Sequence, residues 1–344
     1  MSSVKTDETR RREARLEDRG VRASSGDEVT EDFSRAVAVV RRVRLQPDRD
    51  GPPKGGHYVL GRLIVCVAIA AAPMTRGSIE GHQAAAPVPR KQVLAWADVR
   101  NGYQHDSISH AVATIERLGR ESGAYDTFIR TDSQLITKHP ITFPAGTGIA
   151  AGEQFNVRNL NDFDAIFFFG VREIDLSPEQ RADLLSFVKD DGKGFVAAHS
   201  AATAFFSWPE FGEMLGGRFD EHPWGITDGT LVLDDPTFPA MRHLPRTMVF
   251  HDELYQIKEF SREKIHVLAH LDATRLDLTR PLVHRTDGDF PAAWAKTYGR
   301  GRVFYSILGH GADDWDNPAL QQMYLQAIRW ALRLVDGDAT PHAR

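Results

Sequence analysis

The stretch that decides the fold reads Gly194-Phe-Val-Ala-Ala-His-Ser-Ala201. It is a short apolar run that starts at a glycine and ends in a histidine followed by small residues. Buried strands of a parallel sheet have this composition, because other elements cover both of their faces. Ligands of such sheets bind beyond the carboxyl ends of the strands. The stretch therefore predicts a central strand that delivers the side chain of His199 into a ligand site.

Apolar runs and amphipathic segments alternate around this stretch, which is the pattern of an α/β domain. Ser177-Pro-Glu-Gln180, for example, has the capping serine, the first-turn proline and the glutamine of a helix start. The predicted parallel strands cover residues 92–97, 126–131, 165–169, 194–198 and 301–308, and the predicted helices cover 108–118, 177–191, 208–215 and 318–335. Shorter strand candidates at 229–233, 248–251 and 265–269 predict an antiparallel extension of the sheet.

The beginning of the chain differs in composition from the rest. Residues 1–58 are highly charged and poor in apolar side chains, which predicts a disordered extension or an over-extended reading frame with a true start near Val59. Residues 59–89 are predicted to contain a signal-like segment, residues 59–86, followed by a linker. Their apolar run at 63–72 follows an arginine, as in a secretory signal, and is too short to span a bilayer comfortably.

These segments set the expected location and domain bounds. We expect export to the periplasm or the extracellular space, with no stable membrane span in the mature protein. The alternative is a cytoplasmic protein whose tail carries a chance apolar patch. The expected domain covers residues 90–336, and residues 337–344 are predicted to form a disordered tail.

Composition excludes several classes of function. The formal net charge is −5 and no long basic face is present, so a nucleic-acid partner is not expected. The single cysteine, Cys66, permits neither an intramolecular disulfide nor a cysteine-based zinc finger. The glycine pairs at 216–217 and 299–301 lack the spacing of a phosphate loop, so no nucleotide cofactor is expected. The sequence is compatible with a homo-oligomer.

Polar side chains follow four of the predicted parallel strands. They are His105, Arg172, the pair His199-Ser200, and His310. Because the carboxyl ends of parallel strands lie along one edge of the sheet, these residues are expected to meet there. Histidine serves as a metal ligand or a proton carrier near neutral pH, and a carboxylate completes either arrangement.

The candidate carboxylates lie in His251-Asp-Glu-Leu-Tyr255. If this segment is extended, Asp252 faces away from His251 and Glu253, so all three cannot enter one site. The predicted catalytic residues are His199, Asp252, Glu253 and His310. The predicted metal ligands, for a divalent ion such as zinc, are His199, His222 and Glu253. The predicted substrate-binding residues are His105, Arg172, Ser200, Trp224, Tyr255 and Trp294. The alternative for each histidine is a hydrogen-bonded structural role, and for each tryptophan a place in the core.

Residues from about 91 to 334 resemble the ThuA-like (trehalose utilisation) family, a branch of the class I glutamine amidotransferase-like fold. The resemblance rests on Leu176-Ser-Pro-Glu-Gln180, the stretch 194–201, Leu215-Gly-Gly-Arg-Phe219 with His222, Asp252-Glu253 with Tyr255, Pro291-Ala-Ala-Trp294, the run 298–305, and Leu308-Gly-His310. It implies a three-layer, flavodoxin-like α/β domain with a mostly parallel sheet and an antiparallel extension. It also implies a role in carbohydrate metabolism, on trehalose, related glycosides or their keto forms.

The same comparison excludes amidotransferase chemistry. Those enzymes carry a nucleophilic cysteine after the strand that here ends at Ala198, whereas this chain has His199 and no cysteine in the domain. Ser200 lacks the flanking glycines of a serine nucleophile elbow. Two mechanisms for a sugar hydrolase, lyase or isomerase remain: metal-activated water, or metal-free proton exchange by a histidine and Glu253. The rival hypothesis is a non-catalytic module that binds a carbohydrate or a partner.

Overall fold

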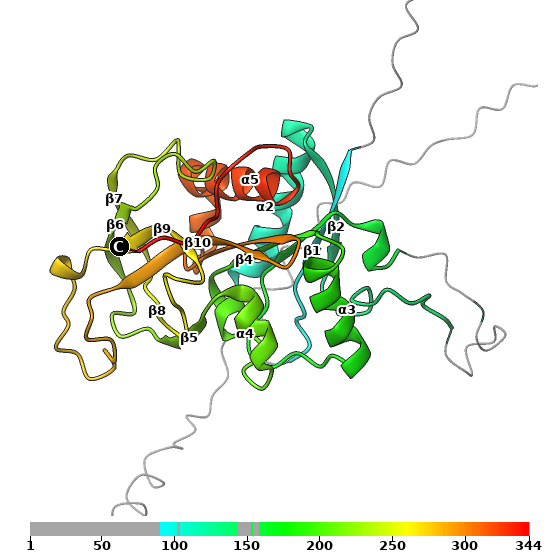
Figure 1. Ribbon diagram of the computed structural model, residues 1–344, viewed down its shortest axis with the longest axis horizontal. Coiled ribbons are helices and arrows are strands. Elements are labelled where there is room, and N and C mark those ends of the chain that lie inside the picture. Colours follow the sequence, from blue (N-terminus) through cyan, green and yellow to red (C-terminus); the bar gives the residue numbers. More distant parts are fainter. Residues whose placement is uncertain (1–89, 102–103, 144–152, 154–157, 344) are drawn as a thin grey trace, which may run out of the picture. The chain divides into compact units, whose positions relative to one another are not determined.

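The computed structural model describes residues 90–101, 104–143, 153 and 158–343. The predicted extension, the signal-like segment and Cys66 lie outside these residues. Among the described residues, nine strands form one sheet in the order β2-β1-β3-β4-β11-β10-β9-β6-β7 (Figure 1). The sheet is mixed, with a parallel half and an antiparallel half that meet between β11 and β10.

The parallel half contains the strands that the sequence predicted. They are β1 (Lys91–Trp96), β2 (Tyr125–Arg130), β3 (Ala165–Phe168), β4 (Gly194–Ala198) and β11 (Gly301–Ser306). Every residue of β3 and β4 is buried, because helices cover both faces of the sheet here. The predicted stretch 194–198 is therefore a central strand, paired with β3 on one side and β11 on the other.

Four helices form the outer layers. They are α2 (Ser107–Ser122), α3 (Pro178–Lys189), α4 (Pro209–Leu215) and α5 (Pro318–Ala331). In Figure 1, α2 and α5 lie on one face of the sheet, and α3 and α4 lie on the other. Helix α3 begins with the predicted capping box, since Ser177 accepts from the Gln180 amide and Gln180 accepts from the Ser177 amide. Helix α5 ends four residues before the predicted boundary.

The antiparallel half contains β10 (Phe290–Tyr298), β9 (His266–Leu271), β6 (Ile226–Leu233) and β7 (Thr247–Glu253). Strands β5 (Arg218–Glu221) and β8 (Gln256–Lys258) form a separate two-stranded sheet. The sequence did not predict β10, although this strand joins the two halves. Its proline and three alanines give little β propensity, and its pairing with β9 shifts register around Ala293.

Short 3-10 turns and a packed carboxyl-terminal segment complete the described chain. The turns are η2 (Leu160–Asp162), η3 (His199–Thr203), η4 (Ala273–Arg275) and η5 (Asp313–Asp316). The segment 337–343, which was expected to be disordered, instead contacts the domain. Ala339 is buried, and His266 hydrogen-bonds to the Thr340 carbonyl. In the described part of the chain, no helix has the length and apolar composition that crossing a bilayer requires.

Candidate functional site

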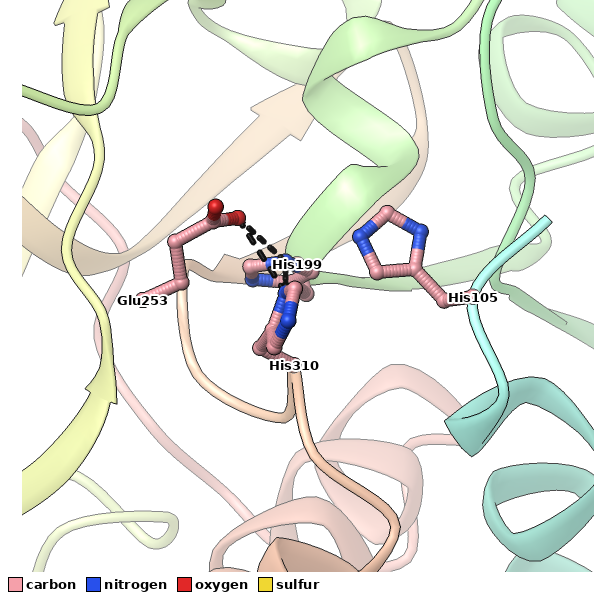
Figure 2. Close-up of side chains that lie close together, drawn as sticks. All are labelled: His105, His199, Glu253 and His310. Atoms are coloured by element: carbon pink, nitrogen blue, oxygen red, sulfur yellow. Dashed lines mark hydrogen bonds and ion pairs between the residues drawn. The ribbon is translucent and has the colours of Figure 1, made fainter. Parts of the chain in front are cut away.

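Four side chains from separate parts of the chain converge at the carboxyl edge of the parallel strands (Figure 2). His105 follows β1, His199 follows β4, His310 follows β11, and Glu253 ends β7. Each offers one nitrogen or oxygen atom, and these four atoms all lie within 4.8 Å of one another. We call this group the His-Glu cluster. It confirms that the strand ends meet, as the parallel pattern predicted.

His199 is held rigidly in a single orientation. It is fully buried, and its φ of 41° lies in the left-handed region that a residue with a side chain rarely adopts. Its own carbonyl accepts a hydrogen bond from the Tyr305 hydroxyl at 2.7 Å. Its Nδ1 lies 2.6 Å from the Ile307 carbonyl oxygen, which can only accept. Nδ1 therefore carries the proton of neutral His199, and the Nε2 lone pair faces the cluster.

The Nε2 atom of His199 is the meeting point of the cluster. It lies 3.1 Å from Nδ1 of His310, 3.4 Å from Oε2 of Glu253, and 2.8 Å from the Tyr255 hydroxyl. Figure 2 shows the Glu253 carboxylate and the His310 ring directed toward His199, with His105 on the other side. Burial raises the pKa of Tyr255 well above its ordinary value, so this hydroxyl keeps its proton and acts as a donor.

The charges within the cluster are strongly coupled. Burial alone would raise the pKa of Glu253, but the contacts with the imidazoles of His199 and His310 outweigh it and hold this pKa far below its ordinary value. The Oε2 atom of Glu253 lies 3.2 Å from Nδ1 of His310, and this contact raises the pKa of His310. Burial, followed by the nearby His199 and His310, lowers the pKa of His105 to about 3. His105 is therefore neutral at physiological pH, which is the form that binds metals.

Asp252 connects the backbone around the cluster and stays outside it. It is 2% exposed. Its Oδ2 accepts from the Gly309 amide at 2.7 Å, and its Oδ1 accepts from the amides of His310 and Glu253 at 3.1 and 2.8 Å. The carboxylate thus joins the loop after β11 to the end of β7. The predicted catalytic role of Asp252 is therefore replaced by a positioning role.

Alternation along β7 follows the prediction for an extended segment. His251 and Asp252 point to opposite sides, since His251 is exposed and pairs with Asp228 at 2.7 Å. Gly309, whose amide bonds to Asp252, has a φ of 113°. A Cβ atom at this position would lie 2.9 Å from the Trp315 ring. Glycine is needed at this position for the loop to reach Asp252 and to present His310.

Two pockets open onto the cluster. The first, of about 450 Å³, is lined by His105, Val171, Arg172, Glu173, Thr203, Phe206, Phe219, His222, Glu253 and Tyr255. We call it the aromatic pocket, after its rings. The second, of about 580 Å³, is lined by His105 and His310 together with the carboxyl groups of Asp106, Asp252, Asp313 and Asp314. We call it the acidic pocket. Burial raises the pKa of Asp314 to about 6.

The structure places the predicted substrate residues in two groups. Arg172 and Tyr255 line the aromatic pocket, and His105 belongs to the cluster itself. The other three are held in the interior by hydrogen bonds to carbonyl groups. Ser200 donates to Gly170, Trp224 to Asp277 and Trp294 to Leu215. Their burial corrects the prediction that they contact substrate.

The structure also changes the set of metal ligands that the sequence predicted. His222 lines the aromatic pocket beside Phe219, with ring centroids 5.6 Å apart, and it is not among the four cluster residues. His105 and His310 take its place. Sequence reasoning had placed both histidines at strand ends but had given neither a ligand role. It missed Phe206 and Phe219 as pocket walls. Phe219 ends the family motif 215–219, but the motif gave no reason to place its ring in a pocket.

The donor set of the cluster could hold a metal ion. Three imidazoles and one carboxylate suit transition metals such as zinc, whereas magnesium and calcium prefer oxygen donors. The hydrogen bond from His199 Nδ1 to a backbone carbonyl is the arrangement that orients a metal-binding histidine. The residues present therefore fit such an ion.

The fold and the site together define an α/β protein whose candidate site lies at the carboxyl edge of the parallel strands. Residues 92–331 match the family described as ThuA, trehalose utilisation, and the chain belongs to this family. A comparison with curated protein sequences found no match.

Two solved structures of ThuA-like proteins show the same fold. A ThuA-like protein from Bacteroides uniformis is 20% identical with a TM-score of 0.55, and the alignment covers 72% of this chain and 93% of that one. A ThuA-like protein from Parabacteroides merdae is 18% identical with a TM-score of 0.51, covering 71% and 90%. A glutamine amidotransferase from Thermotoga maritima aligns at 9% identity with a TM-score of 0.40, covering 71% and 99%.

Proposed function

We propose that this protein is an enzyme that acts on a carbohydrate, either a glycoside or a keto-sugar, at the His-Glu cluster. The proposal includes a divalent cation, such as zinc, held by His105, His199, Glu253 and His310. The observation that carries it is the convergence of four donor atoms within 4.8 Å at the wall of a pocket. The family description, trehalose utilisation, supports a sugar as the substrate.

The residues of the cluster have distinct roles in this proposal. A bound divalent ion would polarise a sugar carbonyl or lower the pKa of water. His199, fixed by the carbonyl of Ile307 and the hydroxyl of Tyr305, offers its Nε2 lone pair. Glu253 supplies the negative charge and can accept a hydrogen bond from Nδ1 of His310, 3.2 Å from its Oε2. His105 stays neutral because it is partly buried and lies beside two other imidazoles.

The aromatic pocket provides surfaces for a sugar ring. Phe206 is 43% exposed, and Phe219 packs edge-on against Tyr255 with ring centroids 4.7 Å apart. Aromatic faces of this kind bind the apolar C–H face of a pyranose, while polar groups fix its orientation. Thr203 and the Tyr255 hydroxyl are such groups. Tyr255 keeps its proton, and once Nε2 of His199 binds the ion this hydroxyl can instead donate to a sugar oxygen held next to His199.

Metal analysis together with a substrate screen tests the proposal. Protein prepared with zinc, manganese, cobalt or nickel is assayed for bound metal by mass spectrometry. It is then screened with trehalose, other glycosides and their 3-keto derivatives, with and without a chelator. We expect about one ion per chain and turnover that is lost in chelator. His310→Gln should bind the ion more weakly and lose turnover, because it removes one ligand, whereas His139→Gln, whose side chain is 72% exposed, should change neither.

Two results would contradict the proposal in different ways. Full turnover in chelator would leave proton exchange by the imidazoles and Glu253 as the chemistry. Sugar binding with no conversion of any substrate in the screen would instead indicate a carbohydrate-binding module that uses the same pocket.

A further inference from the structure

Three arginines line one pocket at the amino edge of the parallel strands, opposite the His-Glu cluster. The pocket, of about 390 Å³, is lined by Arg300, Arg302 and Arg333 together with residues 337–341. Arg300 and Arg302 lie at the start of β11, whereas His310 follows the end of this strand. Because β11 has six residues, the two sites are roughly 20 Å apart. We call this second site the arginine pocket.

The hydrogen bonds of these arginines leave most of their donors available to a ligand. Arg302 donates from Nη1 to the carbonyl groups of Trp330 and Val335, at 2.7 and 3.5 Å. Arg333 donates from Nη2 to the carbonyl group of Arg300. Within the described residues, the Arg300 guanidinium forms no hydrogen bond or ion pair. A guanidinium has five N–H donors, so these contacts occupy one nitrogen of each of two arginines and none of the third.

The positive charge of the arginine pocket is not balanced by the carboxylates around it. The Asp338 carboxylate, in the pocket lining, accepts from the amide of Thr340 at 2.8 Å and from its hydroxyl at 2.6 Å. Burial, followed by the charge of Arg333, lowers the pKa of Arg302, and Asp336 acts in the opposite direction. Both guanidinium groups remain charged at physiological pH, so they repel each other. An anion bound between them would remove this repulsion.

The backbone holds two of the arginines in fixed positions. Arg300 lies in the two-residue turn between β10 and β11, and its amide donates to the Lys189 carbonyl at 2.8 Å. Arg333 follows the end of α5 with a φ of 61°, a position that is usually taken by glycine. Residues held in this region concentrate at functional sites, where the surrounding structure fixes them. The chain thus keeps a charged side chain where glycine would relax the backbone.

We propose that the arginine pocket binds the phosphate group of a small anionic ligand, with Arg300, Arg302 and Arg333 as its donors. Arginine suits this role because its planar fork pairs with two phosphate oxygens at once. The glycines at 299 and 301 lack phosphate-loop spacing, so side chains hold the anion here. The volume of the pocket exceeds that of a bare phosphate and leaves room for a small organic group. The site is separate from the His-Glu cluster and does not depend on the function proposed there.

Calorimetric titration of the full-length protein with inorganic phosphate and with glycerol 3-phosphate tests the inference. The ionic strength is held constant, and a chelator prevents an ion at the His-Glu cluster from capturing the anion. We expect one saturable site with a Kd at or below about 1 mM. Arg300→Gln should weaken binding about tenfold, because it removes a charged donor. Arg333→Gly should weaken it by a similar factor and keep the fold, because glycine suits the positive φ.

The control is Arg275→Gln, whose side chain is 71% exposed and lies outside the pocket lining, and it should bind both probes as the wild type does. Tighter binding of glycerol 3-phosphate would identify a phosphorylated organic molecule as the ligand, and equal or tighter binding of inorganic phosphate would identify the free ion. Both results support the inference. It is overturned if folded wild-type protein shows no saturable binding of either probe, or if affinity is unchanged in Arg300→Gln and Arg333→Gly. Where Arg333→Gly fails to fold, Arg300→Gln decides alone.

Discussion

The two halves of the sheet contribute differently to the candidate site. The parallel half supplies three imidazoles, each from the loop or turn after a strand: His105, His199 and His310. The antiparallel half supplies one carboxylate, from Glu253 at the end of β7. The site therefore lies where the halves meet. Buried parallel strands fix the imidazoles, and a more exposed hairpin provides the carboxylate.

The hairpin of β6 and β7 reaches the site because only a short part of it pairs with the rest of the sheet. β6 and β7 pair over seven residues, but β6 pairs with β9 only from Leu231 to Leu233. The remainder extends past the edge of β9, where Ile226 and Val249 are exposed. Asp252, at the open end of the hairpin, accepts a hydrogen bond from the loop that carries His310. A strand at the edge of the sheet order thus places Glu253 beside the central β4.

The largest expected effect comes from removing the donors of one half at a time. Glu253→Gln leaves three imidazoles, a donor set that is sufficient for zinc in proteins, so we expect metal affinity to fall about 10- to 100-fold. His105→Gln combined with His310→Gln leaves one imidazole and one carboxylate, and we expect no measurable binding. Competition with a fluorescent zinc chelator measures both.

The control for this comparison is Glu116→Gln, on the outer surface of α2, which should leave affinity unchanged. Loss of binding in Glu253→Gln together with tight binding in the double histidine variant would reverse the assignment. The antiparallel half would then be the main source of metal affinity.

Most of the parallel half could be predicted from the sequence. Its strands are continuous apolar runs, and the strand-end rule located His105, Arg172, His199 and His310. That rule needs only the order and direction of the strands along the chain, and both can be read from the sequence. It could not distinguish a ligand from a substrate contact, because both lie at the same edge of the sheet. The distances within the cluster, which make His105 and His310 ligand candidates, exist only in the fold.

The antiparallel half was harder to predict. Strand β10 is rich in alanine and contains a proline, so its local propensity indicates no strand, and tertiary pairing alone makes it central. Trp224 and Trp294 resembled sugar platforms in composition, yet both lie in the interior. Phe206 and Phe219, which line the pocket instead, have no local signal that separates them from core residues. His222, which the sequence suggested as a metal ligand, lines the aromatic pocket and is not among the cluster residues.

A smaller effect is expected from uncoupling the halves at Asp252. Asp252→Asn keeps the shape of the side chain but replaces one accepting oxygen with an amide group. At least one of the amides of Gly309, His310 and Glu253 then loses its acceptor in the interior. We expect the free energy of unfolding to fall by about 2–3 kcal/mol and metal affinity to fall about tenfold. Urea denaturation and the chelator competition measure the two quantities. An unchanged metal affinity would show that the loop holds His310 without Asp252.

The smallest expected effect comes from a buried charge cluster within the antiparallel half. Asp234, after β6, accepts from Arg262 at 3.0 Å and lies 2.6 Å from His270, and all three side chains are nearly buried. Burial would raise the pKa of Asp234, but the contacts with His270 and Arg262 outweigh it and hold the pKa below its ordinary value. A lowered pKa means that the ionised carboxylate stabilises the folded state.

This stabilisation should be fully present above about pH 4, the ordinary pKa of an aspartate, and should be lost as the pH falls through the lower folded pKa. Asp234→Asn should therefore cost about 1–2 kcal/mol of unfolding free energy at neutral pH, and its difference from wild type should shrink in acid. Asp126→Asn is the matched control in the parallel half, because its pair with Arg90 is exposed and contributes at most about 1 kcal/mol. Urea denaturation of the three proteins between about pH 3 and 7 measures the difference. A constant difference across that range would mean that the carboxylate acts by shape and hydrogen bonding, and that charge contributes to the metal site but not to the stability of this half.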